Sequence, residues 1–274
     1  MSILQIRIGS PGEKGDGFRL GNNRVKTVSE SCTLDKSGYA MPHHERLTVL
    51  ILLICAFLSA AMPATAADSL PDGFVDVKEL IPTIHVDLRY ATDDNFVGRP
   101  IDGYLVNRCI LTREAAHALK QVQDELTGFG LGLKIFDAYR PQRAVDHFVR
   151  WAKDLGDTAM KSRYYPEVKK GDLFKKGYIA ERSGHSRGST VDVTIVSLTI
   201  PTYGTELDMG TRFDFFGRES WPENLSLPPD PRANRLLLRA VMMKYGFKPY
   251  SKEWWHFTLE NEPYPDTYFN FPVR

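Results

Sequence analysis

Cysteine, net charge and long apolar runs are all scarce in this 274-residue chain. The formal charge at neutral pH is only +1, and no cluster of lysine and arginine stands out, so we expect neither a nucleic acid nor an acidic polymer as a partner. Internal repeats and low-complexity tracts are also lacking, which excludes repeat architectures. With 42% hydrophobic and 25% charged residues, the composition is that of an ordinary globular protein.

The chain contains no run of the ~20 apolar residues that a membrane-spanning helix needs. Its most apolar stretch, residues 47–58, instead has the length of a signal-peptide core, and Ala64-Thr65-Ala66 supplies the small residues that a signal peptidase requires. We therefore expect residues 41–66 to be a signal peptide that sends the protein to the periplasm or outside the cell. We then expect no stable membrane association, a membrane anchor or a buried helix being the alternative.

Residues 1–40 precede this stretch and show no clear apolar period. The simplest interpretation is that Met41 is the true start and that residues 1–40 are an upstream extension, with a long leader as the alternative. Cleavage after Ala66 would leave residues 67–274 as one domain. Of the three cysteines only Cys109 lies in that part, so an intrachain disulfide is excluded despite the expected export. We interpret Cys109 as a small buried apolar residue.

Strands and helices do not alternate regularly along the rest of the chain, which favours an α+β fold with a central, largely antiparallel sheet flanked by helices. The apolar patterns, caps and glycine stops predict strands over residues 82–90, 132–140, 191–196 and 252–260, and helices from Thr112 to Gly128, Pro141 to Gly156 and Pro231 to Gly246. Two long connections remain, an expected surface loop over residues 157–182 and an expected ordered loop over residues 201–230.

His185 and Asp192 are the first candidates for chemistry, in the stretch SGHSRGSTVDVTI (183–195). Because side chains alternate along a strand, Asp192 faces away from its apolar neighbours. A buried carboxylate needs a cation or hydrogen-bond donors, and Gly184 and Gly188 permit the bends that fold His185 back over it. Both are side chains that zinc binds. Each residue alone also fits a surface histidine or a strand-edge aspartate.

The stretch EWWHF offers a third ligand and a base. A catalytic zinc usually has three protein ligands, so His256 is a candidate. Glu253 lies three residues earlier, close enough to take a proton from water without coordinating the metal. Trp254 and Trp255 would line the pocket and lower its local dielectric. The alternative is an ordinary aromatic core strand.

Arg140, in DAYRPQRA, ends a predicted strand just before Pro141. A rigid guanidinium there can polarise a carbonyl and hold an oxyanion. The alternative is an arginine that only bridges to Asp137 or to a helix end, and Arg143 competes for the role from within the helix. The remaining histidines of the expected domain sit in predicted strand or helix positions, without an expected acidic companion, and are interpreted as structural or exposed: His85, His117 and His147.

Taken together, these motifs resemble the VanX-type D-alanyl-D-alanine dipeptidases, within the broader family of zinc D-Ala-D-Ala peptidases. The resemblance extends from about residue 74 to the C-terminus, and its motif order is specific. It rests on YATDDNFVGRPIDGY (90–104), DAYRP (137–141), SGHSRGSTVDVT (183–194), MGTRFDFF (209–216) and EWWHF (253–257). It implies the family's α+β fold, also seen in hedgehog-like domains, and hydrolysis of D-Ala-D-Ala.

The resemblance also implies roles for individual residues. His185, Asp192 and His256 would bind one zinc ion per chain. Glu253 would be the general base and then the acid that protonates the leaving amine. Arg140 would stabilise the oxyanion.

Two further positions match the family's substrate-binding residues. Asp214 is similar to the carboxylate that receives the free amino group of the substrate, and Ser183 would contribute hydrogen bonds near it. The expected export differs from several well-known cytoplasmic members and favours D-alanine salvage or cell-wall peptide turnover over glycopeptide resistance.

Three other functions compete with this interpretation. The first is a D,D-carboxypeptidase or endopeptidase that acts on longer peptidoglycan peptides with the same chemistry. The second is a non-haem iron oxygenase, which also uses two histidines and one carboxylate but needs no base such as Glu253. The third is a zinc-stabilised binding domain without catalysis, against which Glu253 argues.

Overall fold

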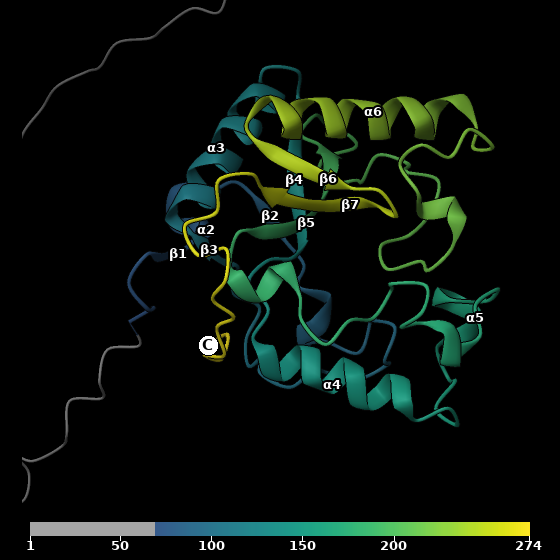
Figure 1. Ribbon diagram of the computed structural model, residues 1–274. Helices are drawn as coiled ribbons and strands as arrows, with labels where there is room; N and C mark the ends of the chain where they lie inside the picture. The colour runs from purple at the N-terminus through teal and green to yellow at the C-terminus, as the bar shows by residue number, and fades with distance from the viewer. Residues whose placement is uncertain (1–68) are drawn as a thin grey trace, which may run out of the picture. The chain divides into compact units, whose positions relative to one another are not determined.

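The structure, a computed structural model, describes residues 69–274. Within these residues the centre is a five-stranded sheet in the order β2–β4–β5–β7–β6, and a separate ribbon pairs β1 with β3 (Figure 1). In the five-stranded sheet β2 and β4 run parallel, and the other neighbouring pairs are antiparallel. The expected α+β fold with a largely antiparallel sheet is confirmed. The predicted signal peptide and upstream extension lie outside the described residues.

The strands are β1 (Phe74–Asp76), β2 (His85–Val86), β3 (Ile110–Thr112), β4 (Leu131–Asp137), β5 (Thr190–Ser197), β6 (Phe247–Tyr250) and β7 (Glu253–Leu259). The α-helices are α2 (Val77–Leu80), α3 (Arg113–Thr127), α4 (Gln142–Lys153), α5 (Lys161–Tyr164) and α6 (Pro229–Lys244). Short 3₁₀ helices are η1 (Arg89–Ala91), η2 (Lys170–Asp172), η3 (Gly184–Arg187) and η4 (Arg218–Ser220). None of the helices within residues 69–274 is both long and apolar enough to cross a membrane.

Helix α3 forms where the sequence predicts it. The Thr112 side chain accepts a hydrogen bond from the Ala115 amide at the first turn, and Gly128 follows the last turn. Its apolar stripe, spaced by three and four residues, is buried and includes Leu119 and Val122. Each such side chain contributes about 1.5–3 kcal/mol when removed from water.

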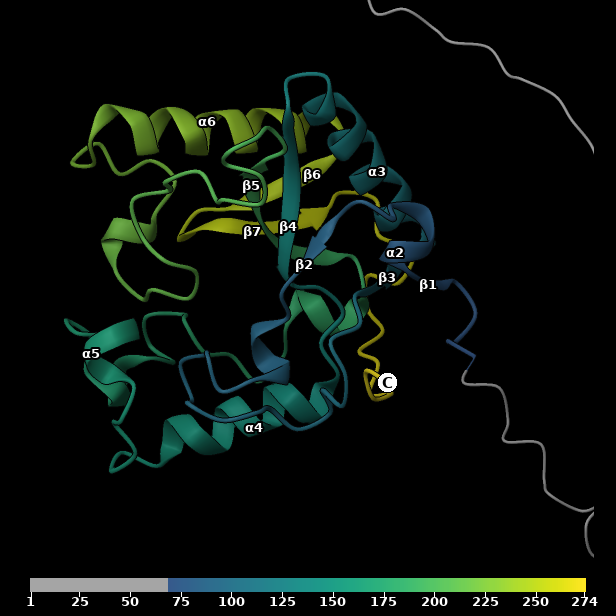
Figure 2. The ribbon, with the colours of Figure 1, turned by 180° about the vertical axis from the view of Figure 1, so that it is seen from behind.

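Helices α3 and α6 pack against the sheet, whereas α4 lies apart from it (Figures 1 and 2). The loops that carry η1 and η3 lie between α4 and the sheet. The cavity described below is lined by residues of these elements.

Three element boundaries differ from the prediction. Only His85–Val86 of the expected strand 82–90 pairs with β4. The Asp87 amide still donates to the Ile135 carbonyl oxygen of β4, but the Leu88 amide donates to the Asn107 side chain instead. Helix α4 ends at Lys153, three residues early. Helix α6 ends at Lys244, two residues before the expected Gly246, and β6 begins at Phe247 after Gly246 turns the chain with a φ of 85°.

The interpretation of residues 157–182 as a surface loop is wrong. The segment contains α5 and η2, and several of its side chains are part of the core: Tyr164, Tyr165, Val168, Leu173 and Ile179. Aromatic and aliphatic side chains without helical or strand spacing can still be buried when another element covers them. Here α4 is such an element, because its Trp151 contacts Tyr165. The second connection, residues 201–230, is an ordered loop interrupted by η4 and the start of α6, as expected.

Candidate metal centre and substrate cavity

Three polar side chains of the site lie next to one another because of the strand register. Asp192 of β5 pairs with Asp137 of β4 on one side and with His256 of β7 on the other. Directly paired residues of neighbouring strands present their side chains on the same face. A carboxylate therefore lies between a second carboxylate and an imidazole on one face of the sheet, although the three residues are distant in sequence.

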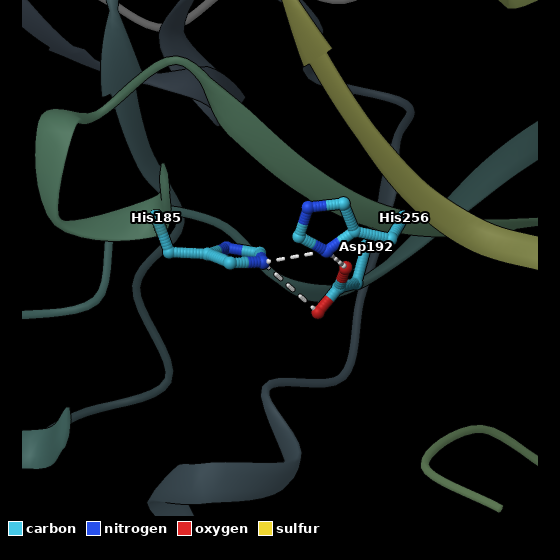
Figure 3. Close-up of side chains that lie close together, drawn as sticks. All are labelled: His185, Asp192 and His256. Atoms are coloured by element: carbon cyan, nitrogen blue, oxygen red, sulfur yellow. Dashed lines mark hydrogen bonds and ion pairs between the residues drawn. The ribbon is translucent and has the colours of Figure 1, made fainter. Parts of the chain in front are cut away.

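His185 joins this group from η3. The Ser183 side chain caps η3 by accepting a hydrogen bond from the His185 amide, and Gly188 ends it with a φ of 83°. The turn directs His185 Nε2 to 3.3 Å from Asp192 Oδ2 and 3.3 Å from His256 Nδ1 (Figure 3). His256 Nδ1 lies 3.1 Å from Asp192 Oδ1.

This cluster has the dimensions of a metal site. The candidate ligand atoms of His185, Asp192 and His256 all lie within 4.8 Å of one another. Tetrahedral zinc with ligands at ~2.0–2.2 Å places neighbouring ligand atoms ~3.3–3.6 Å apart, close to the separations found here. Asp192 Oδ1 is buried with His256 Nδ1, 3.1 Å away, as its contact and without a well-formed hydrogen bond, so a cation would balance its charge. The donor set and its spacing therefore fit zinc.

The ring of His185 is held in one orientation by the end of β4. Its Nδ1 lies 2.7 Å from the Ala138 carbonyl oxygen and 3.4 Å from Asp137 Oδ2. Nδ1 therefore donates its proton to the carbonyl, which leaves Nε2 with a lone pair directed at Asp192. Sequence reasoning named Asp137 only as a partner of Arg140 and missed this supporting position. The sequence does indicate Asp137 as a candidate, because it lies three residues before Arg140 in the same motif.

Arg140 makes the bridge to Asp137 and also lines the cavity, so the two alternatives for this residue coexist. Its Nε and Nη2 lie 2.9 and 2.8 Å from Asp137 Oδ2, and Nη2 lies 3.7 Å from Asp192 Oδ2. The guanidinium also lies over the rings of Tyr90 and Phe148, at 5.0 and 5.2 Å. These contacts hold a positive charge rigidly beside the candidate metal centre.

Glu253 begins β7 beside the cluster. Its Oε2 lies 3.6 Å from His256 Nδ1. Burial raises the pKa of the Glu253 carboxyl to about 7, even though His256 and Arg140 act to lower it. A carboxylate with a pKa near neutrality can both accept and return a proton, which is the requirement for a general acid–base group.

Asp214 lies in the same cavity and is almost fully buried. Its backbone has a φ of 60°, a conformation uncommon outside glycine, and the Tyr90 hydroxyl donates a hydrogen bond of 2.9 Å to its Oδ2. Burial, reinforced by the negative charge of Asp192, raises the pKa of Asp214 well above its usual range. A cationic ligand would relieve this cost. Sequence reasoning did not identify Tyr90 as a site residue.

One cavity of about 290 Å³ connects these groups. All seven predicted site residues line it, including Ser183 at the start of η3. Its apolar wall comes from α4, from residues 177–180 and from the 201–230 loop, and includes Phe148, Ile179 and Phe216. Drug-sized ligands occupy cavities of ~300–1,000 Å³, so this one is suited to a smaller ligand.

The three remaining histidines do not line this cavity. His117 is exposed on α3, and His85 contacts the Tyr203 ring. His147 was expected to lack an acidic companion, but its Nδ1 lies 3.2 Å from Asp102 Oδ1 because the loop before β3 folds against α4.

Comparisons with known proteins identify relatives of this chain. The Peptidase_M15 family model, described as D-ala-D-ala dipeptidase, matches residues 71–274. A protein named D-alanyl-D-alanine dipeptidase from Streptomyces coelicolor is 46% identical over 200 residues, covering 73% of this chain and 98% of the relative. Its namesake from Enterococcus faecalis is 44% identical over 202 residues, covering 74% and 98%. A solved structure of the D,D-pentapeptidase VanY with Zn(II) is 14% identical, covers 58% of this chain and 77% of that chain, and has a TM-score of 0.36.

Proposed function

This chain belongs to the D-Ala-D-Ala dipeptidase family, and from that premise we propose that it hydrolyses D-alanyl-D-alanine to two molecules of D-alanine. We propose one zinc ion per chain, held by His185, Asp192 and His256. The observation that carries the proposal is the position of Glu253, a largely buried carboxylate with a pKa of about 7 beside this three-residue cluster.

Each residue of the site has a defined task in this reaction. The chemistry that zinc supplies when bound is Lewis acidity, which lowers the pKa of a water molecule toward ~7. Glu253 takes a proton from the attacking water and then delivers it to the leaving amine. Arg140, fixed by Asp137, places its positive charge where the carbonyl oxygen becomes negative.

The substrate is oriented by its own charges. Asp214 accepts the free ammonium group of the dipeptide, which offsets the cost of burying this carboxylate. Ser183 lines the same cavity, and its hydroxyl is available to donate to the substrate while its oxygen caps η3. A required ammonium group favours a dipeptidase over an endopeptidase.

The small cavity supports the dipeptide over the alternative substrates, which are longer peptidoglycan peptides. Residues 177–180 and Phe216 form part of its wall, so the two long connections limit the space beyond the dipeptide. We expect purified protein to cleave D-Ala-D-Ala and to leave tripeptides and pentapeptides ending in D-Ala-D-Ala intact. Equal rates on the long and short peptides would establish the carboxypeptidase instead.

Metal analysis tests the zinc assignment independently of the substrate. We expect one zinc ion per chain, loss of hydrolysis with a chelator and recovery on adding zinc. Stoichiometric iron with oxygen-dependent turnover would establish the oxygenase.

We also propose that the protein is exported through residues 41–66 and acts in cell-wall peptide turnover or D-alanine salvage. The small residues at 64–66, placed after the apolar stretch, support this proposal. Cell fractionation tests it: D-Ala-D-Ala hydrolysis should appear in the periplasmic or secreted fraction, with a mature N-terminus near residue 67. Activity confined to the cytoplasm would exclude export.

A further inference from the structure

The C-terminal segment of residues 262–271, here called the C-terminal strap, crosses behind the site. The backbone of one of its residues, Phe269, joins two parts of the site. The Phe269 amide donates to the Ser186 carbonyl oxygen at 2.8 Å, and its own carbonyl accepts from the Gln142 amide at 3.0 Å. Ser186 follows His185 directly, and Gln142 follows Arg140 by two residues. The strap therefore connects the turn that carries a candidate zinc ligand to the loop that carries the candidate oxyanion group.

A side-chain pair fastens the strap to this turn. Arg187, the last residue of η3, binds Glu262 in a bidentate manner, with Nε at 2.9 Å from Oε2 and Nη2 at 2.6 Å from Oε1. The side chains are only 18% and 11% exposed, so solvent screens the pair weakly. Two parallel hydrogen bonds fix direction as well as distance.

An aromatic ring of the strap contacts both ends of the segment around His185. The Tyr268 ring centroid lies 4.9 Å from the Arg182 guanidinium carbon and 5.7 Å from that of Arg187. Arg182 and Arg187 lie on either side of Ser183 and His185 in the sequence. The strap thus contacts both ends of this segment and the Ser186 backbone, while Ser183, Gly184 and His185 line the cavity.

The turn itself has little internal support. Helix η3 is four residues long. Its internal contacts are the Ser183 cap and two backbone hydrogen bonds, from the Ser186 amide to the Ser183 carbonyl oxygen at 3.1 Å and from the Gly188 amide to the His185 carbonyl oxygen at 3.0 Å. Short 3₁₀ turns have poor hydrogen-bond geometry. Contacts from other elements must therefore contribute to the position of the His185 ring.

From these contacts we propose that Arg187 and Glu262 are positioning residues, which hold the η3 turn so that His185 meets Asp192 and His256. The inference rests on the proposed function, because it takes His185 as a zinc ligand. Neither residue lines the cavity. They act through the backbone of η3 and through the strap.

Zinc affinity of the full-length chain, measured by competition with a chromogenic chelator, tests this inference. Outer-shell partners of metal ligands typically change metal affinity by ~10–100-fold. We expect Glu262→Gln and Arg187→Gln each to weaken zinc binding about tenfold, near the lower end of that range. The double variant should lose little more than either single variant, because both remove the same pair. Arg187→Lys should show a partial loss, since lysine keeps the charge but lacks the two-pronged geometry.

The pair between Glu125 of α3 and Lys244 of α6 provides a matched control. Here the single Lys244 Nζ lies 2.9 and 2.8 Å from the two carboxylate oxygens of Glu125, and the pair lies away from the cavity. Glu125→Gln should leave zinc affinity unchanged. If Glu262→Gln lowers the Tm but leaves zinc affinity equal to that of Glu125→Gln, the pair is merely structural and the inference is overturned.

Hydrogen exchange of the metal-free protein separates failure of this inference from failure of the proposed function. In Glu262→Gln the amides of Gly188 and Phe269 should exchange at least several-fold faster, with unchanged exchange in β5. Unchanged exchange at these two amides would refute the positioning role whether or not the chain binds zinc. A wild-type chain that binds no zinc would overturn the proposed function and the assignment of His185 to the metal. If its Glu262→Gln variant still loosens η3 in that case, the positioning role of the Arg187–Glu262 pair is retained.

Discussion

The two faces of strand β5 are equally buried and yet differ in chemistry over residues 191–195. One face carries Val191, Val193 and Ile195, all fully buried among apolar side chains. The other carries Asp192, between Asp137 and His256 of the adjacent strands, and Thr194, whose hydroxyl is buried without a hydrogen-bond partner. Burial alone therefore does not identify a core position, and the type of group that is buried shows what each face does.

The polar face is kept at a cost in stability. Burial raises the pKa of Asp137 on this face, and of Asp214 in the loop across the cavity, which means that the folded protein disfavours their charged forms. Asp192 differs, because His185 and His256 lower its pKa in spite of its burial. The apolar face and the helices packed against the sheet supply the stability that offsets this cost. Substitutions on the polar face should change catalysis, and substitutions on the apolar face should change folding.

The largest effect is expected at Glu253. Glu253→Gln keeps the shape of the side chain but removes the base, and general acid–base groups contribute ~10²–10⁴-fold to rate. We expect kcat to fall toward the upper end of that range while zinc remains bound. The Tm should not fall, because the variant removes a buried carboxylate. Steady-state kinetics with metal analysis measure both quantities, and undiminished hydrolysis would remove Glu253 from the mechanism.

Arg140→Lys should have the next largest effect on catalysis. Lysine retains a positive charge near Asp137 but cannot reproduce the paired contacts of the guanidinium. Loss of one oxyanion donor typically costs ~10²–10³-fold in turnover, so we expect a decrease of about 10²-fold in kcat with a smaller change in KM. A change confined to KM would assign Arg140 to ground-state binding.

Ile195→Ala tests the opposite face. Removing a buried isoleucine side chain typically costs ~2–5 kcal/mol of unfolding free energy, and Ile195 has no exposed surface. Chemical denaturation should show this loss. The kcat of the folded fraction should stay within about twofold of wild type, because the side chain points away from the cavity. A large loss of kcat at full folding would show that the two faces are not independent.

The smallest effect is expected for Glu125→Gln, which breaks the exposed pair between α3 and α6. Exposed ion pairs contribute little to stability because water and salt screen them. Thermal melts and steady-state kinetics should both match those of the wild-type protein. A clear drop in Tm would show that the α3–α6 contact depends on this pair.

Local signals predicted some elements well and others poorly. Helix α3 was predictable because its cap, apolar stripe and glycine stop all lie within the segment itself. The end of β2 was not, because a side chain 19 residues away captures the Leu88 amide. The burial of residues 157–182 was equally hidden, since α4 covers aromatic side chains that show no regular spacing.

By itself, the sequence determined which side chains were available for chemistry and, through the two-residue period of a strand, that Asp192 faces away from its valines. Only the tertiary structure decided that His256 and Asp137 are its neighbours, because strand register is set by long-range pairing. It also decided that Asp137 contacts both His185 and Arg140, and that the C-terminal strap is hydrogen-bonded to η3 through Phe269 and Ser186. Alternation is a property of one strand, whereas a site formed by three strands and a turn depends on how separate segments pack.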